Sequence, residues 1–455
     1  MKNKKNTFMY IVAAIAAIGG VLFGFDTGVI SGALLLIKKQ WALSTASQEF
    51  AVSAVLIGAM IGAALSGRLA DSWGRRRVII ITAGIFALGT LGAAASASVN
   101  WLIASRIVIG VAIGIASFCV PLYISEVAPA KQRGALVSLN QLAITIGILV
   151  SYFIDDIFAA MTGGWRFMFA AGILPAVVLG VGMLFLPRTP RWLMINGRDE
   201  EARSVLEKMG TIESVDAAIG DMKRSLSEEK SGGLRELFVP WLRMPLFIGI
   251  GIMFFQQITG INTVIYYAPT IFEMAGFKSD VVAIAATMGV GALNVIMTVV
   301  AIYVIDKIGR KPLLFVGLIG MAISLGILGL AFKEEAYLGA ALKWVSVGSL
   351  LLYIGSFAIS LGPVAWLIIS EIYPLRIRGL AMSIATLSNW AFNFIVASTF
   401  LSIVQALGAS SAFWIYAVLS AMGWLFCYFF VPETKGHKLE DIEEHWIQGK
   451  SPREL

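Results

Sequence analysis

Two ionisable side chains lie deep inside long apolar segments of the sequence. Asp26 falls within residues 8–37, and Arg106 falls within residues 101–123. A charge at the centre of a bilayer costs at least about 2.5–3.5 kcal/mol, so such a residue usually forms a pair, faces a cavity or carries a function. We therefore expect a proton-coupling switch made of Asp26 and Arg106. The alternative is a purely structural Asp–Arg pair.

Neutral amide and aromatic side chains form a second unusual group within the apolar segments. An uncharged ligand covered with hydroxyl groups needs neutral hydrogen-bond donors and acceptors, and its C–H surface needs a flat aromatic face. Any single amide in an apolar helix can instead tie two helices together. As a set, these side chains predict a substrate-binding site, and its candidate residues are Phe23, Gln141, Gln256, Gln257, Asn262, Tyr266, Asn294, Trp366, Asn389, Trp390 and Asn393.

The composition indicates that membrane-spanning helices position these residues. The chain has 455 residues, of which 58% are hydrophobic and 14% charged, and its mean hydropathy is +0.83. A soluble chain of this length needs more charge to cover its surface. The apolar segments are close to the 20 residues that cross a bilayer. We predict an all-α membrane protein with twelve spans, at about 8–37, 50–69, 78–98, 101–123, 135–155, 166–186, 245–271, 281–304, 312–332, 343–369, 380–404 and 411–431.

The spans fall into two groups of six, separated by a polar stretch. We expect a first six-helix bundle over 1–186, a cytoplasmic linker with short amphipathic helices over 187–244, a second bundle over 245–431 and a cytoplasmic tail over 432–455. With the N-terminus inside, 28 of the 35 Lys and Arg residues lie on the inner side. The excess of positive charge on cytoplasmic loops places both termini in the cytoplasm.

Three motifs occur twice, in the same order, once in each group of spans. Duplicated halves around a site at the middle of the membrane are typical of alternating-access transporters. The pairs are Asp71-x-x-Gly74-Arg75-Arg76 with Asp306-x-x-Gly309-Arg310-Lys311, Ser125-Glu126-x-x-Pro129-x-x-x-Arg133-Gly134 with Ser370-Glu371-x-x-Pro374-x-x-x-Arg378-Gly379, and Pro187-x-Thr189 with Pro432-x-Thr434.

The repeated charges and several flexible positions are candidates for gating. Ion pairs at the cytoplasmic mouth, for example between Glu126 and Arg133 or between Glu371 and Arg378, can form in one state and break in the other, and a difference of a few kcal/mol is enough to shift the equilibrium. Gly362-Pro363 is expected to break the tenth span and act as a hinge. The gating candidates are Tyr267, Gly362, Pro363, Asp71, Arg75, Arg76, Glu126, Arg133, Asp306, Arg310, Glu371, Arg378 and Glu433.

The sequence argues against several other classes of protein. It contains no catalytic constellation, no phosphate-binding Gly-x-x-x-x-Gly-Lys-Ser/Thr loop and no cluster of metal ligands. The two histidines, His437 and His445, lie in the tail, so neither can relay a proton within the membrane. We therefore expect no enzymatic activity, no metal, no nucleic-acid partner and no cofactor other than the proton as coupling ion.

The motifs together resemble the sugar porter branch of the major facilitator superfamily over nearly the whole chain. The resemblance rests on the Asp71–Arg77 turn and its repeat, and on Gly24-Phe-Asp26-Thr-Gly28, Pro187-Arg-Thr-Pro190-Arg191, Gln256-Gln257-Ile-Thr-Gly260-Ile-Asn262 and Pro432-Glu-Thr434-Lys-Gly436. It implies the major facilitator fold, a sugar site whose closest matches are Gln141, Gln256, Gln257, Asn262, Asn294 and Trp366, and proton symport through Asp26.

One residue departs from the family pattern. The turn after the sixth span usually reads Pro-Glu-Ser-Pro-Arg, whereas Arg188 stands here in place of the acid, and the second half keeps Glu433. We expect this change to weaken the contact in the first half and to favour inward-open states.

The sequence thus predicts a secondary active transporter that couples proton entry to uptake of a monosaccharide such as glucose, galactose or xylose. A facilitative uniporter or exchanger, or a proton-coupled symporter of inositol or another polyol, are the alternatives. We expect it to work as a monomer in the lipid bilayer of a bacterial cytoplasmic membrane.

Overall fold

Twelve helical segments are long and apolar enough to cross a membrane, as the sequence predicts. The computed structural model describes residues 2–128, 133–209, 215–216, 219–220, 222–223, 239–374, 377–437 and 439–455, and all regular structure in these ranges is helical. Because the twelve segments carry few charges, the chain is a multi-pass membrane protein.

The first six spans form one half of the molecule. Their helices are α1 (Lys2–Gln40), α2 (Thr45–Trp73), α3 (Arg75–Ala94), α4 (Val99–Val127) and α5 (Arg133–Ala159), followed by α6 (Gly164–Ala171) and α7 (Ile173–Phe185), which share the sixth span. Within this half, α2 packs along α4 and α1 packs along α5. Gly58 and Gly110 let α2 and α4 approach closely, because a Cβ on either residue would lie about 2 Å from a backbone carbonyl oxygen of the other helix.

The last six spans form the other half. Their helices are α11 (Arg243–Ile258) and α12 (Ile261–Met274), then α13 (Asp280–Ile308), α14 (Arg310–Lys333), α16 (Ala341–Ile359), α17 (Leu361–Glu371), α18 (Arg378–Ala397) and α19 (Phe400–Phe430). Short helices connect or flank the spans: α8 (Pro190–Ile195), α9 (Asp199–Met209), α15 (Glu335–Leu338) and α20 (Leu439–Ile447), with 3-10 turns at Pro240–Leu242 and Pro452–Glu454. Helices α8 and α9 lie in the linker, where the sequence predicts short amphipathic helices, and α20 lies in the expected tail. The rest of the expected linker lies mostly outside the described residues.

Two spans are broken into separate helices. The seventh breaks at Gly260, whose φ of +93° suits glycine. The tenth breaks at Ser360, two residues before the predicted break at Gly362-Pro363. Pro363 has no N–H with which to bond the carbonyl of residue 359, so it is tolerated only in the first turn of a new helix, and that helix must begin upstream of it.

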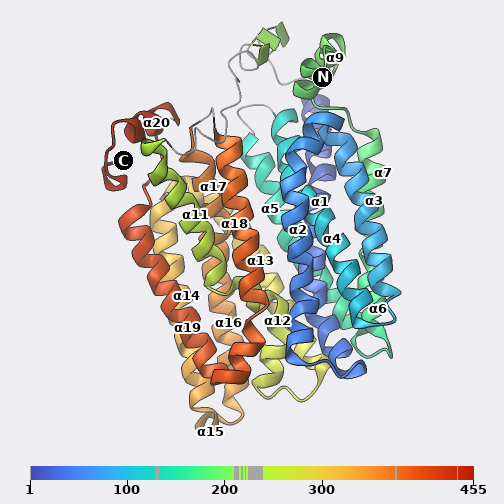
Figure 1. The fold of residues 1–455 in the computed structure, drawn as a ribbon, viewed down its shortest axis with the longest axis vertical. Helices are drawn as coiled ribbons and strands as arrows, with labels where there is room; N and C mark the ends of the chain where they lie inside the picture. The colour runs from blue at the N-terminus through green and yellow to red at the C-terminus, as the bar shows by residue number, and fades with distance from the viewer. Residues whose placement is uncertain are drawn as a thin grey trace.

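The two halves stand side by side, with both chain ends at one end of the molecule (Figure 1). We call this end, which also holds α9 and α20, the termini face, and the other end the opposite face. The halves meet where α5 packs against α13, α2 against α18, and α1 against α12. These contacts place residues of α1, α12 and α18 at the centre of the molecule.

The close approach of α2 and α4 can be tested with Gly110→Ala. The added Cβ would lie 1.9 Å from the carbonyl oxygen of Val55, so the helices must separate, and we expect a loss of about 1–3 kcal/mol of stability. Gly84→Ala in α3 is the matched control, since a Cβ there meets no atom within 4 Å. Thermal unfolding in detergent should show a lower midpoint for Gly110→Ala only. Equal midpoints for the two variants would contradict the close packing.

Candidate functional site

Asp26 and Arg106 form a buried ion pair in the first half. The Arg106 Nη1 lies 3.2 Å from the Asp26 Oδ1, and the two residues are 0% and 2% exposed, respectively. The Arg106 Nη2 also donates to the Val52 carbonyl at 3.2 Å, and the guanidinium lies 6.0 Å from the centre of the Phe169 ring. The arginine is therefore held by α1, α2 and α6 together. Removing the charge of Asp26 would leave it without its counter-ion.

Four of the predicted amides form a continuous hydrogen-bonded network in the second half. Asn262 donates to Gln257 at 2.6 Å, Gln257 donates to Asn389 at 3.1 Å, and Asn389 donates to Gln256 at 2.6 Å. Gln256 in turn donates to the Leu361 carbonyl at 2.9 Å, at the start of α17. The network thus joins both parts of the broken seventh span to α18 and to the second part of the tenth span.

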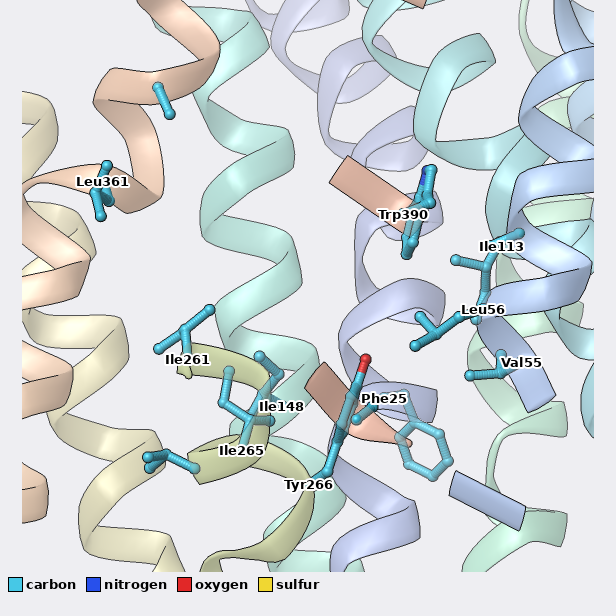
Figure 2. Close-up of a cluster of buried hydrophobic side chains, with 14 of the residues drawn as sticks. Phe25, Val55, Leu56, Ile113, Ile148, Ile261, Ile265, Tyr266, Leu361 and Trp390 are labelled. Carbon is cyan, nitrogen blue, oxygen red and sulfur yellow. The ribbon is translucent and has the colours of Figure 1, made fainter. Parts of the chain in front are cut away.

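Two further pairs of predicted residues lie next to this network. Phe23 of the first half and Trp390 of the second half have ring centres 5.3 Å apart, and Asn393 lies 3.4 Å from the Tyr266 hydroxyl. Figure 2 shows the Tyr266 hydroxyl on the side of the ring nearest Trp390. The Trp390 Nε1 and the Asn393 Oδ1 are buried and have no hydrogen-bond partner among the described residues. Each is a group that a ligand can satisfy, since unpaired buried polar atoms are costly.

Three predicted site residues belong neither to the network nor to the two pairs beside it. Gln141 of α5 and Trp366 of α17 are half-buried, and Asn294 of α13 is buried. The structure brings the other eight candidates together from α1, α11, α12 and α18. The network carries no net charge, which suits recognition of a neutral, hydroxylated ligand.

The opposite face is closed by contacts that sequence reasoning missed. Lys38 pairs with Glu273 and Lys39 with Asp280, each at 2.6 Å, and both pairs join the two halves. Glu49 of α2 accepts hydrogen bonds from the backbone N–H and the hydroxyl of Ser402, in α19. The only signal in the sequence was the placement of these charges at span ends, which does not identify their partners.

Tyr267, a predicted gating residue, also lies near this closure. It is fully buried, its hydroxyl donates to the Ala397 carbonyl at 2.8 Å, and its ring centre is 5.3 Å from that of Phe400. Its neighbour Tyr266 lies one position closer to the amide network. Tyr267 therefore lies between the candidate binding site, which includes Tyr266, and the opposite face.

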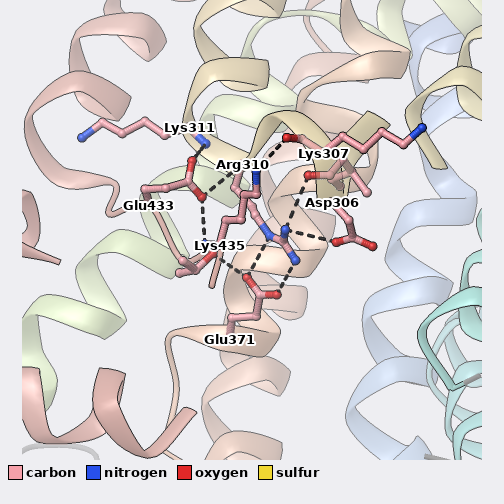
Figure 3. A network of polar contacts seen from close by, with 9 residues as sticks. Asp306, Lys307, Arg310, Lys311, Glu371, Glu433 and Lys435 are labelled. Carbon is pink, nitrogen blue, oxygen red and sulfur yellow. Dashed lines mark hydrogen bonds and ion pairs between the residues drawn. The ribbon is translucent and has the colours of Figure 1, made fainter. Parts of the chain in front are cut away.

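At the termini face, the repeated motifs form matching ion-pair clusters within each half. Arg75 pairs with Asp71 and with Glu126, both at 3.0 Å. In the second half Arg310 pairs with Asp306 at 3.1 Å and with Glu371 at 2.9 Å (Figure 3). In this conformation Glu371 accepts from Arg310, and Arg378 donates to the Tyr373 carbonyl. The pair of Glu371 with Arg378, expected to form in one state and break in the other, stays a prediction. The side chain of Arg133, the expected partner of Glu126, lies outside the described residues.

The remaining gating candidates fix neighbouring segments to these clusters. Arg76 donates to the carbonyls of Met183 and Leu184 at the end of α7. Glu433 accepts from the backbone N–H groups of Arg310 and Lys311 at 3.1 and 3.0 Å. Gly362 and Pro363 lie in the first turn of α17, where the Gly362 carbonyl is 3.4 Å from the Gln256 amide nitrogen.

Asp155 is a further buried carboxyl that the sequence did not single out. It is 0% exposed, its Oδ2 accepts from the Gly32 N–H at 3.1 Å, and its Oδ1 has no partner among the described residues. It lies at the end of the expected fifth span, which is why it did not appear as an intramembrane charge. No cation pairs with it in the described part of the chain, in contrast to Asp26.

Known transport proteins are similar to this protein over nearly the whole chain. Residues 12–446 match the family described as "Sugar (and other) transporter". The chain is 42% identical to a D-xylose transporter of Levilactobacillus brevis over 445 residues, covering 97% of this chain and 96% of that protein. It is 39% identical to a galactose-proton symporter of Escherichia coli over 454 residues, covering 100% and 97%.

The chain is also similar to solved structures of sugar transporters. The partially occluded inward open conformation of the xylose transporter from E. coli matches with a TM-score of 0.84 and 34% identity, covering 95% of this chain and 100% of that one. The proton:xylose symporter bound to 6-bromo-6-deoxy-D-glucose matches with a TM-score of 0.82 and 36% identity, covering 97% and 99%. The chain therefore belongs to the sugar transporter family of the major facilitator superfamily, and it is a membrane transporter rather than an enzyme.

Proposed function

We propose that this protein is a proton-coupled symporter that takes up a monosaccharide by alternating access. The observation that carries the proposal is the buried Asp26–Arg106 pair in a molecule that also holds a neutral amide network. The names of relatives support it, since they include a galactose-proton symporter and an arabinose-proton symporter. Glucose, galactose, xylose and arabinose all fit the chemistry of such a site.

The amide network supplies the groups that bind sugar hydroxyls. Each amide carries both donors and an acceptor: Gln256, Gln257, Asn262 and Asn389. The hydroxyl groups of a bound sugar can therefore replace the hydrogen bonds that these amides now make to one another. Trp390 offers an aromatic face and its Nε1, which has no partner among the described residues, and Phe23 adds a face from the first half. A ligand that contacts both Phe23 and the network bridges the two halves, which is the requirement for coupling binding to their movement.

The ion pair supplies the coupling to protons. Protonation of Asp26 removes the charge that holds Arg106, and this alters the relative free energies of the two states. One proton that enters down 100 mV releases about 2.3 kcal/mol. A tenfold gradient of sugar costs about 1.4 kcal/mol. One proton per sugar is therefore sufficient for accumulation.

The contacts between the halves indicate which state this conformation represents. Lys38–Glu273, Lys39–Asp280 and Glu49–Ser402 join the halves at the opposite face, whereas the arginine clusters at the termini face lie within each half. We place the basic termini face in the cytoplasm, in line with the positive-inside rule, and we propose that this conformation faces inward. We place the protein in a bacterial cytoplasmic membrane, and we propose that it functions as a monomer.

Uptake into proteoliposomes tests the coupling. With an inward proton gradient, wild type should accumulate a labelled sugar above equilibrium, and Asp26→Asn should only equilibrate it while retaining exchange. A panel of glucose, galactose, xylose, arabinose and inositol would identify the substrate. If the gradient has no effect on wild type, the protein is a facilitative transporter and Asp26 is structural.

Asp155→Asn is the matched control for this variant. Both changes remove a buried carboxyl in the first half, but Asp155 has only the Gly32 N–H as partner and no counter-ion among the described residues. An amide oxygen can accept that hydrogen bond equally well, so we expect accumulation within about twofold of wild type. Loss of accumulation in both variants would show that the assay reports burial of carboxyl groups in general and not the Asp26–Arg106 pair.

Asn389→Ala tests the amide network. Asn389 links Gln256 to Gln257, so its loss removes sugar contacts and disorders the neighbouring amides, and we expect sugar affinity to fall by about tenfold or more. Ser388→Ala is the control, since that hydroxyl donates, within the described part of the chain, only to the Ala385 carbonyl of its own helix. Calorimetric titration of the purified protein measures both. Unchanged affinity in Asn389→Ala would remove the network from the binding site.

Glu49→Ala tests the closure of the opposite face. The change removes both hydrogen bonds to Ser402, so the outward-open population should rise and a cysteine placed at Ser53, one turn away, should be labelled several-fold faster. Gln48→Ala is the control, because Gln48 donates within its own half to the Leu43 carbonyl. Equal labelling rates in the two variants would show that Glu49 does not hold the halves together.

A further inference from the structure

Helix α12, the second part of the seventh span, contains a proline that leaves one backbone carbonyl without a partner in its own helix. In a regular α-helix the N–H of residue 269 would donate to the carbonyl of Ile265. Residue 269 is Pro269, which lies inside α12 and has no N–H. Ile265 is buried, and an unsatisfied buried carbonyl is costly. This carbonyl therefore needs a donor from outside α12.

That donor comes from the other half of the molecule. The hydroxyl of Tyr152, in α5, donates to the Ile265 carbonyl at 3.1 Å, and Tyr152 is 1% exposed. The ion pairs that close the opposite face also join the halves, but their side chains are partly exposed. The Tyr152 bond is thus a contact between the halves that lies in the dry interior.

The second half is also shaped to receive the Tyr152 ring. A Cβ on Gly291 of α13 would lie 2.8 Å from the Tyr152 Cδ2 and 3.3 Å from the Leu149 Cα. At Gly289, in the same helix, a Cβ would meet no atom within 4 Å. Because α5 packs against α13, the missing side chain at Gly291 gives the ring the room that it needs to reach α12.

The bond lies between the candidate sugar site and the opposite face. Ile265 directly precedes Tyr266 and follows Asn262 of the amide network by less than one turn. The helix then continues to Glu273, whose pair with Lys38 closes the opposite face. Tyr152 therefore holds α12 in the part of the molecule where the two halves must separate if that face is to open.

We propose that Tyr152 is a positioning residue for transport, whose hydroxyl holds α12 against the first half only while the opposite face is closed. In the closed arrangement the Ile265 carbonyl depends on Tyr152, because Pro269 cannot supply an N–H. When the face opens, water enters between the halves and can satisfy both groups. Loss of the hydroxyl therefore costs free energy in one state and little in the other, which shifts the equilibrium. The inference rests on the proposed alternating access, but not on which sugar is carried or on coupling to protons.

Tyr152→Phe in the full-length protein tests this role. Labelling of a cysteine placed at Ser53 reports opening of the opposite face without sugar or a proton gradient, so its result is independent of the proposed coupling. Labelling should become several-fold faster in Tyr152→Phe. Tyr123→Phe is the matched control and should label as wild type does, because this buried hydroxyl also donates to a backbone carbonyl, that of Pro187 at 2.8 Å, but within the first half.

A double-mutant cycle separates this role from general packing. Pro269→Ala gives residue 269 an N–H that can donate to the Ile265 carbonyl within α12. In that background Tyr152→Phe should change the labelling rate by less than about twofold. The proposal is wrong if Tyr152→Phe labels no faster than Tyr123→Phe, or if its effect persists undiminished in Pro269→Ala. Thermal unfolding of each variant in detergent shows that it is folded.

Discussion

A charge that this chain places in the hydrocarbon is costly unless it finds a partner within the protein, because water cannot replace a lost partner there. The Asp26–Arg106 pair is the strongest case, since each residue is a buried charge that depends on the other. Removing one member of a buried ion pair is strongly destabilising, because the other member is left as a buried charge without a partner. The same constraint that stabilises the pair therefore makes it suited to transmit the gain or loss of one proton.

The broken spans obey the same constraint. A break in a helix exposes backbone groups at the level of the bilayer, which is tolerated only where the protein satisfies them. At the break near Gly260, the Thr259 carbonyl accepts from the Tyr353 hydroxyl. At the other break, the carbonyls of Leu361 and Gly362 face the Gln256 amide. The two broken spans are thus joined by Tyr353 and by Gln256. Because Gln256 also belongs to the candidate sugar site, binding and backbone geometry are linked.

At the termini face, the two halves have the same arrangement of ion pairs but different residues at one helix start. Each has an arginine that pairs with two carboxylates, and each begins its next span after a glycine with positive φ. The second half adds Glu433 to the helix start, whereas the first half has Arg188 at the matching position of the repeat. A single change of residue in a repeated motif has therefore made the two halves electrostatically different where they face the cytoplasm in our proposed orientation.

The sequence by itself determined the twelve spans, the family and the residue types of the candidate site. These follow from local properties: hydropathy sets which segments enter the bilayer, and charges or amides inside such segments stand out against their surroundings. The tertiary structure alone decided which of these groups meet. Residues such as Glu49 and Ser402, or Glu433 and Lys311, are far apart in the chain, and their contact depends on how the helices pack. The break at Ser360 and the partner of Glu371 were likewise decided by the packed structure, because a local motif marks a flexible or charged position but not the neighbours that complete it.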